Sequence, residues 1–282
     1  MEKLRLAYIW SFRNAAADLA GQDIPYRGGQ RYMVSPLEYL VTALNDTPLG
    51  QRYQLVAVIN DDDPDSPRDR ASLQGYGFDP RQADQWYYPR DLQLAGRPVN
   101  ELLCSVPSSY RRLPLDAPQR VAGKQAFERQ LASLLQELRV DVVILDGLLV
   151  ILDELIRPGS PFERRIFNIH PGITRSDSPY QRRGAYATWD ALYGARGQKV
   201  VDWAQRQTVP VAVVDRTGAS FHYVDGGIDS GEVVVDALNT VIDPEDTILE
   251  LRWNNFTHSL LPLLVTGLEA VAGRLQVDQP AA

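Results

Sequence analysis

Short runs of β-branched and other apolar residues recur along the chain and predict the strands of a sheet. Three of these runs contain few polar residues: residues 4–10, 53–60 and 140–145. Runs of this kind are typical of parallel strands that are covered on both faces. Residues 165–169 form a shorter candidate strand. Residues 219–224 and 232–238 flank a glycine-containing turn, so we expect them to pair as a hairpin.

Helical segments alternate with these strands. Four segments have the periodicity or composition of helices: residues 35–44, 123–139, 186–193 and 246–271. The first carries Leu37, Leu40 and Leu44 on one helical face, and its Ser-Pro start is typical of a helix N-terminus. Pro262 is expected to kink or break the last helix. The alternation predicts an α/β fold with a mostly parallel central sheet and helices on both faces.

Two stretches after the second predicted strand have no clear periodicity. Residues 61–70 form a charged, proline-containing connection that we expect to be a loop. Residues 75–119 form a long stretch that contains the aromatic residues Trp86, Tyr87 and Tyr88. Stretches of this length are commonly functional or structured in their own way. No repeat or linker divides the chain, so we expect a single domain over residues 1–282.

Composition restricts the class of protein. A hydrophobic content of 44% is typical of a globular chain, and the single cysteine, Cys104, excludes a disulfide scaffold and favours the cytoplasm. The net charge of −7 disfavours nucleic acid as the main partner. No apolar run approaches the roughly 18 residues that span a bilayer, and the first residues do not resemble a signal peptide. We expect a cytoplasmic protein with no membrane partner.

Several common catalytic motifs are absent from the sequence. Neither a GxxxxGK[ST] phosphate loop nor a GxGxxG turn follows the first predicted strand. The three histidines, His170, His222 and His258, do not have HxxxH or HExxH spacing, so no metal site is predicted. No GxSxG nucleophile elbow is present. The candidate chemistry therefore lies elsewhere.

Asn168 and His170 stand at the end of the predicted strand over residues 165–169, and a loop rich in Gly, Pro and Ser follows them. Residues two apart on an extended backbone point to the same side. An amide donor beside a titratable imidazole suits a carbonyl oxygen that becomes an oxyanion. The alternative is a strand-end Asn that hydrogen-bonds a turn, beside a structural His. Residues 224–232 add an acidic glycine turn in which Asp229 is either a functional carboxylate or only a turn former.

Together these segments resemble the 10-formyltetrahydrofolate-dependent formyltransferase family. The resemblance spans roughly residues 140–238 and is poor between residues 51 and 122. The segments that carry it are Asn168-Ile169-His170-Pro171, Arg183-Gly184-Ala185, Thr217-Gly218-Ala219-Ser220-Phe221-His222, Val224-Asp225 and Asp229-Ser230-Gly231. The strand and turn over residues 142–152 are also similar to the family pattern.

This resemblance implies a Rossmann-like formyltransferase fold with large loop insertions, one of them at about residues 62–122. It implies 10-formyltetrahydrofolate as formyl donor, no metal, and a catalytic set of Asn168, His170 and Asp229. Asn168 donates to the oxyanion, His170 stabilises the same charge or moves the proton, and Asp229 orients His170 and helps to accept the proton. The implied folate-binding residues are Leu149, Val150, Leu152, Asp225, Gly226, Gly227 and Ile228.

The acceptor is a small amine in this interpretation. The chain ends soon after Asp229, which leaves no room for the extra C-terminal domain of the methionyl-tRNA formyltransferases. Residues 11–14 also depart from the glycine-rich phosphate loop of the glycinamide ribonucleotide transformylases. Overall the sequence resembles the branch that formylates the side-chain hydroxylamine of ornithine for the siderophore pyoverdine. The candidate acceptor-binding residues are Arg13, Asn14, Asn254, Thr257 and His258, with Arg182 and Arg183 as alternatives.

This branch implies N5-hydroxyornithine as acceptor. The chemistry is consistent with this, because a hydroxylamine nitrogen is much less basic than an alkyl amine and is free to attack at neutral pH. Its product would pass to a non-ribosomal peptide synthetase. Two alternatives stay open. One is a formyltransferase for another small amine, such as an amino sugar nucleotide or glycinamide ribonucleotide. The other is a non-catalytic folate-binding relative.

Overall fold

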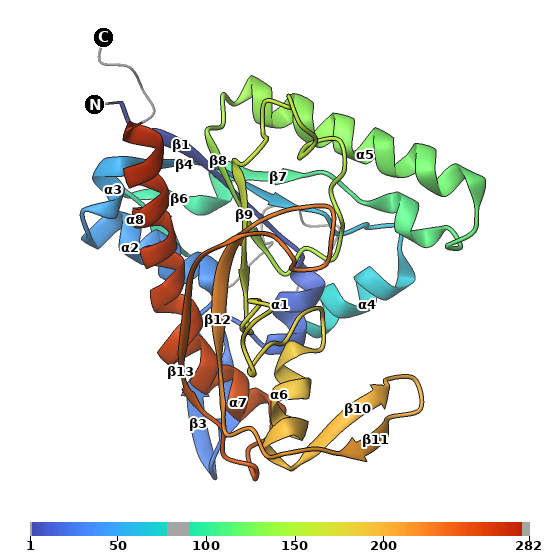
Figure 1. Ribbon diagram of the computed structural model, residues 1–282. Coiled ribbons are helices and arrows are strands. Elements are labelled where there is room, and N and C mark those ends of the chain that lie inside the picture. The colour runs from blue at the N-terminus through green and yellow to red at the C-terminus, as the bar shows by residue number, and fades with distance from the viewer. Residues whose placement is uncertain (1, 78–90, 278–282) are drawn as a thin grey trace.

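The computed structural model describes residues 2–77 and 91–277, and its main feature is a seven-stranded sheet (Figure 1). The strand order is β13-β12-β9-β8-β1-β4-β7. Strands β9, β8, β1, β4 and β7 run parallel, whereas β12 is antiparallel to β9 and β13 is antiparallel to β12. The bounds are β1 (Leu4–Trp10), β4 (Tyr53–Asn60), β7 (Leu103–Ser105), β8 (Val142–Asp146), β9 (Ile166–His170), β12 (Arg216–Tyr223) and β13 (Val233–Val241).

Helices cover both faces of this sheet, which confirms the predicted fold class (Figure 1). Strands β1 and β4 begin and end where the apolar runs predict, and β12 and β13 form the predicted hairpin. The helices are α1 (Phe12–Asp18), α2 (Pro36–Asp46), α3 (Leu49–Arg52), α4 (Pro67–Gly75), α5 (Pro118–Glu137), α6 (Ala187–Ala195), α7 (Ile248–Asn255) and α8 (Leu261–Val277).

Short elements decorate this frame. Three two-stranded ribbons pair β2 with β3, β5 with β6, and β10 with β11. Their bounds are β2 (Asp23–Tyr26), β3 (Gly29–Tyr32), β5 (Gln93–Leu94), β6 (Arg97–Pro98), β10 (Gln198–Asp202) and β11 (Gln207–Pro210). Single helical turns are η1 (Val99–Leu102), η2 (Ser109–Arg112) and η3 (Phe256–Leu260). Trp86, Tyr87 and Tyr88, named above in the long aromatic stretch, lie outside the described residues.

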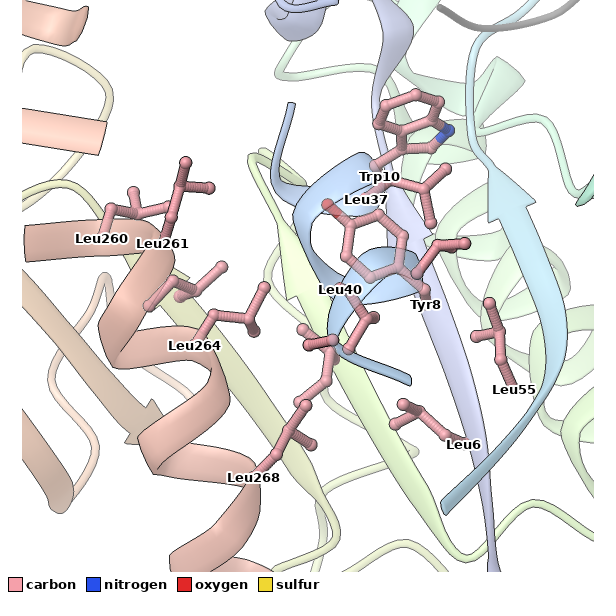
Figure 2. Packing of buried hydrophobic residues seen from close by; sticks show 14 of the residues in the cluster. Leu6, Tyr8, Trp10, Leu37, Leu40, Leu55, Leu260, Leu261, Leu264 and Leu268 are labelled. Carbon is pink, nitrogen blue, oxygen red and sulfur yellow. The ribbon is translucent and has the colours of Figure 1, made fainter. Parts of the chain in front are cut away.

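The alternation of side chains along β1 supplies two cores. Leu6, Tyr8 and Trp10 point to the face covered by α2 and α8, and all three are buried. Figure 2 shows Leu40 of α2 and Leu264 of α8 directed toward this strand. At about 25 cal/mol per Å² of buried apolar surface, side chains of this size each contribute roughly 1.5–3 kcal/mol. This core holds the last helix against the sheet.

The intervening β1 residues, Ala7 and Ile9, point to the opposite face, where α5 packs. Phe127, Leu131 and Leu135 of α5 are buried there, at the helical spacing that the sequence predicts. Helix α5 begins five residues earlier than expected, at Pro118, where the missing N–H of proline costs nothing. Both cores contain residues of β1 and β8 and hold these two strands in place. The carboxyl ends of the strands are therefore well positioned to support a binding site.

The last helix does not break at Pro262. Helices α7 and α8 are joined by the π-helical turn η3, and Pro262 follows directly as the second residue of α8. A π turn holds one more residue than an α turn and so rotates the residues beyond it around the helix axis. By length and composition alone, residues 248–275 could cross a membrane, but 56% of the most apolar window is buried, as in the core helix of a globular domain.

The prediction of a loop over residues 61–70 is wrong from Pro67 onward, where α4 begins. Ser66 caps this helix by accepting from the Asp69 N–H at 3.2 Å. The signal is the same Ser-Pro pair that correctly marks the start of α2, where Ser35 accepts from the Glu38 N–H. The charged residues that follow concealed this start, because α4 has no apolar stripe to reveal its period.

A buried ion network fastens α1 to the loop after β4. The Arg13 side chain is only 8% exposed, and its guanidinium lies 3.0 Å from Asp61 and 3.1 Å from Asp62. Asp62 also accepts from the backbone N–H groups of Phe12 at 2.6 Å and Arg13 at 3.2 Å. Burial, with the neighbouring charge of Asp61, raises the pKa of Asp62 to about 6 against the opposing charge of Arg13. The network positions a helix whose seven residues could not be stable alone.

We predict that Arg13→Leu destabilises the fold by about 3–5 kcal/mol, because it leaves buried carboxylates without their cation. Urea denaturation measures this change. The matched control is Arg97→Leu, which removes an exposed pair with Glu101 and should cost less than about 1 kcal/mol. Equal effects of the two substitutions would show that the buried network contributes nothing special.

Candidate active site

The site is built where β9 meets the antiparallel strand β12. Asn168 and His170 stand two apart on β9, so their side chains leave the same face of the sheet. The antiparallel register pairs Asn168 with His222 of β12 and thus brings a second histidine beside them. The loop between β12 and β13 then returns over this edge and delivers Asp229.

The Asp229 carboxylate is the centre of the site, with only 14% of its side chain exposed. Its Oδ1 accepts from Asn168 Nδ2 at 3.0 Å, and its Oδ2 accepts from the Gly184 N–H at 2.8 Å. His170 Nδ1 lies 3.3 Å from Oδ2, and His222 Nε2 lies 3.5 Å from Oδ1. Burial raises the pKa of Asp229, but His222, the charge of His170 and the Gly184 N–H outweigh burial and hold that pKa well below its usual range.

The backbone of Asp229 is left-handed, with φ of 47°. Such a conformation is uncommon for a residue with a side chain, although Asp tolerates it better than most. A turn former alone would leave its carboxylate on the surface, as at many Asp-Gly turns. Here the left-handed backbone directs the carboxylate inward to four partners. The arrangement favours the functional interpretation of Asp229 over the turn-former alternative.

Both ring nitrogens of His170 face oxygen atoms. Nε2 lies 3.0 Å from the backbone carbonyl oxygen of Arg182, and Nδ1 faces Asp229. A neutral imidazole carries a hydrogen on only one nitrogen, so the second contact becomes a hydrogen bond only when the ring is protonated. Burial lowers the pKa of His170, and the Asp229 charge offsets only part of this effect. The lowered pKa favours a neutral ring. When the ring takes up a proton, the Arg182 carbonyl oxygen and the Asp229 carboxylate can accept from its two N–H groups.

His222 is the site residue that sequence reasoning did not include in the catalytic set. It is 2% exposed, its Nδ1 lies 2.8 Å from the Tyr223 carbonyl oxygen, and its Nε2 lies 3.4 Å from Asn168 Nδ2. The residue does stand in the quoted motif segment, six positions after the start of β12. Only the register of β12 against β9 shows that it belongs with Asn168, and that register is not readable from one sequence.

A cavity of about 470 Å³ opens over these residues. Three large apolar side chains on its rim are unusually exposed: Leu149 at 55%, Ile151 at 38% and Ile228 at 61%. Apolar surface left open beside convergent polar groups is characteristic of a ligand site. Of the seven candidate folate-binding residues, five line the cavity: Leu149, Val150, Asp225, Gly227 and Ile228. Leu152 is instead buried in the α5 core, and Gly226 is not among the lining residues.

Of the five candidate acceptor-binding residues, the structure brings only Asn14 to the cavity. Arg13 is held in the ion network, and Asn254 is held by Tyr26 at 2.9 Å and Asp246 at 3.1 Å. Thr257 and His258 are exposed and do not line the cavity. The π turn η3 turns them outward and presents Phe256 and Leu260 instead.

The alternative cations are also engaged elsewhere. Arg182 donates from Nη1 to the carbonyl oxygen of Gln181 at 2.7 Å. Arg183 donates to the carbonyl oxygen of Thr174 at 2.6 and 3.0 Å. Neither Arg182 nor Arg183 is among the residues that line the cavity. Within residues 2–77 and 91–277, no group of three or more His, Cys, Asp or Glu side chains is placed to hold a metal ion.

Asp146, at the carboxyl end of β8, is a further cavity residue that the sequence did not single out. Tyr8 donates its hydroxyl hydrogen to Asp146 Oδ2 at 2.5 Å. Burial, assisted by the nearby charge of Asp18, raises the pKa of Asp146 to about 7. A carboxylate that is costly to ionise yet lines a cavity is a candidate functional group.

Comparison with known proteins shows the family of this chain. The formyl transferase family profile matches residues 113–265. PvdF of pyoverdin biosynthesis, an N10-formyltetrahydrofolate-dependent formyltransferase, shares 63% identity over 96% of this chain and 99% of its own, with a TM-score of 0.89. The chain belongs to the formyl transferase family and is a formyltransferase, as its motifs predict.

More distant structures share the fold alone. Phosphoribosylglycinamide formyltransferase from Anaplasma phagocytophilum is 18% identical, with a TM-score of 0.52 over 97% of this chain and 88% of its own. Glycinamide ribonucleotide transformylase 1 from Symbiobacterium toebii is also 18% identical, with a TM-score of 0.53 over 99% of this chain and 91% of its own. The TM-score of 0.89 against 0.52 and 0.53 shows that the overall structure of this chain is more similar to PvdF than to these two structures.

We predict that Asp146→Asn stabilises the fold increasingly as pH rises from 5 to 8. The folded carboxyl, with a pKa of about 7, holds a proton that the unfolded chain releases near 3.8, so wild-type stability falls as pH rises through this window. At about 1.4 kcal/mol per pKa unit, the gain at pH 8 is on the order of 2–4 kcal/mol. Urea denaturation at several pH values measures it. The control is Asp153→Asn, at an exposed carboxylate, and a pH-independent gain for Asp146→Asn would contradict the prediction.

Proposed function

We propose that this chain transfers the formyl group of 10-formyltetrahydrofolate to the side-chain hydroxylamine nitrogen of N5-hydroxyornithine, for the synthesis of pyoverdine. The observation that carries the proposal is the convergence of Asn168, His170 and Asp229 on one cavity with an apolar rim. The 63% identity to PvdF over nearly the full chain supports both the formyl donor and the pathway. The product is a hydroxamate, a bidentate iron ligand.

The folate donor lies on the apolar rim in this proposal. Leu149, Ile151 and Ile228 offer the exposed apolar surface that an aromatic ring system covers. In this proposal, backbone N–H and C=O groups of the loops that bear them would bind the polar edge of the pterin. With the ring system there, the formyl group of the donor extends toward β9 and the catalytic residues.

The amine attacks the formyl carbon, and the carbonyl oxygen gains negative charge. Asn168 donates to this oxygen from Nδ2, where the long 3.4 Å contact to His222 is readily exchanged for the stronger bond to an anion. A preorganised donor of this kind lowers the barrier, because it requires no reorganisation as charge develops. The bond from the formyl carbon to the folate nitrogen then breaks, and the formyl group stays on the acceptor.

One proton must pass from the attacking nitrogen to the departing folate nitrogen. His170 is suited to carry it, since burial keeps the imidazole neutral until the amine releases the proton. The Asp229 carboxylate stays ionised beside it, stabilises the imidazolium and holds the ring in place. The chain thus both receives and returns the proton, with no net change in its own charge.

The surroundings of the reaction follow from its chemistry. We place it in the cytoplasm, where reduced folate and free amino acids are available. The hydroxamate product then serves as a building block for a non-ribosomal peptide synthetase. The whole of residues 1–282 forms one catalytic domain in this proposal, and the insertion at about residues 62–122 includes the acidic loop and α4 that fasten α1 beside the cavity.

We predict that Asn168→Ala lowers kcat by roughly 10²–10³-fold with little change in the affinity for the folate donor, because an oxyanion donor acts mainly in the transition state. Asp229→Asn should lower kcat at least as much. Stopped-flow detection of tetrahydrofolate release measures both. Asn45→Ala, at an exposed amide outside the cavity, is the matched control. Near wild-type turnover in either site variant would remove the catalytic set.

An acceptor panel tests the substrate. With 10-formyltetrahydrofolate as donor, we expect formyl transfer to N5-hydroxy-L-ornithine, detected by mass spectrometry, at least 100-fold more efficient than transfer to glycinamide ribonucleotide or an amino sugar nucleotide. Transfer only to one of the phosphorylated amines would assign the chain a different acceptor. Folate binding without transfer to any amine would instead favour the non-catalytic alternative.

A further inference from the structure

The cavity has a second, charged end that the transfer chemistry does not use. Beyond the catalytic residues, the end of β8, the end of α1 and the helix α7 contribute Asp146, Asp18 and Arg252 to the cavity lining. Strand β8 lies on the opposite side of β9 from the β12–β13 hairpin whose loop carries Asp229, and α1 follows β1, the next strand beyond β8. Arg252 reaches this end from α7, which follows β13 in the chain. Together these three residues give this end of the cavity its charge.

Asp146 has a hydrogen-bond donor but no cation. Tyr8 occupies its Oδ2 at 2.5 Å, and no Lys, Arg or His of the described residues forms an ion pair with it. The register places Asp146 between Trp10 of β1 and Ile169 of β9. A buried carboxylate in this situation gains most from a ligand that brings a positive charge. Such a ligand would enter the same cavity that Asn168, His170 and Asp229 line.

Asp18 and Arg252 form an ion pair beside it. Arg252 Nη1 lies 2.6 Å from Asp18 Oδ1 and donates to the Ala17 carbonyl oxygen at 3.0 Å. The side chains are 23% and 16% exposed, so both remain open toward the cavity. Among the described residues, no contact occupies Arg252 Nη2 or Nε. A guanidinium with free N–H groups is the preferred partner of a carboxylate.

We propose that this end binds the α-amino-acid group of the acceptor, with the α-ammonium on Asp146 next to Asp18 and the α-carboxylate on Arg252. The inference rests on the proposed function and adds the residues that select an amino acid. Opposite charges on the protein match both charges of a zwitterion. A phosphorylated acceptor would meet two carboxylates and only one cation, Arg252, which is already paired with Asp18. This end of the cavity therefore disfavours a phosphate group.

The spacing suits an ornithine side chain. Asp146 is in register with Ile169, which stands between Asn168 and His170 on the neighbouring strand. Neighbouring strands lie about 4.8 Å apart. Three methylene groups span a comparable length between the α-carbon and the reacting nitrogen. An α-ammonium anchored on β8 therefore delivers the side-chain nitrogen to the catalytic residues of β9.

The test combines protein and acceptor truncation. Asp146→Asn should lower kcat/KM for N5-hydroxy-L-ornithine by roughly 30-fold or more, mainly through KM, because it removes one partner of a buried charge pair. For 5-(hydroxyamino)pentanoic acid, which lacks the α-ammonium, the same substitution should change kcat/KM less than threefold. Asp153→Asn, outside the cavity, should change neither value.

A second pair tests the carboxylate end without relying on one variant. Arg252→Gln should weaken use of N5-hydroxy-L-ornithine but leave N-hydroxyputrescine, which lacks the carboxylate, nearly unaffected. Donor binding and circular dichroism of both variants show whether they fold. Equal losses on complete and truncated acceptors, or no loss at all, would overturn this inference while leaving the proposed function standing. Failure of the wild type to formylate N5-hydroxyornithine would overturn both.

Discussion

The buried carboxylate of Asp229 is the constraint on which the site depends. It joins Asn168 and His170 of β9, His222 of β12 and the N–H of Gly184 in the intervening loop. These segments meet only because β12 runs antiparallel to β9 at the edge of an otherwise parallel group of strands. Strand β12 ends opposite the start of β9, and the hairpin loop that follows brings Asp229 back to Asn168 and His170. One reversal of strand direction thus brings these side chains together at one cavity.

The cavity around this carboxylate combines two unfavourable features that a ligand would relieve. Large apolar side chains stay exposed on the rim, and Asp146 lies where burial opposes its ionisation. Both lower the stability of the empty protein, which the two cores around β1 and the Arg13 network can sustain. Binding sites often give up folding stability in this manner. In the proposed mode of binding, the donor would cover the rim and a cationic acceptor would compensate Asp146.

The parts of the fold that sequence predicts are those whose signal is local. Strands β1 and β4 and helix α2 follow from apolar runs, period and a Ser-Pro cap, and the formyltransferase family follows from motif resemblance. Features that depend on distant partners escaped prediction. Helix α1 needs Asp62, about fifty residues away, and His222 needs the β12 register. Pro262 marks an irregularity in the last helix, but it does not reveal that the π turn before it leaves Thr257 and His258 exposed.

A crystal structure of the ternary complex tests the central claim most directly. The donor site would hold a folate analogue whose formyl group is carried on carbon and cannot be transferred, with N5-hydroxy-L-ornithine as acceptor. The account predicts the formyl oxygen within hydrogen-bond distance of Asn168 Nδ2, the hydroxylamine nitrogen facing the formyl carbon, and the α-ammonium on Asp146. A formyl group directed away from β9, or an acceptor bound outside the cavity, would contradict it.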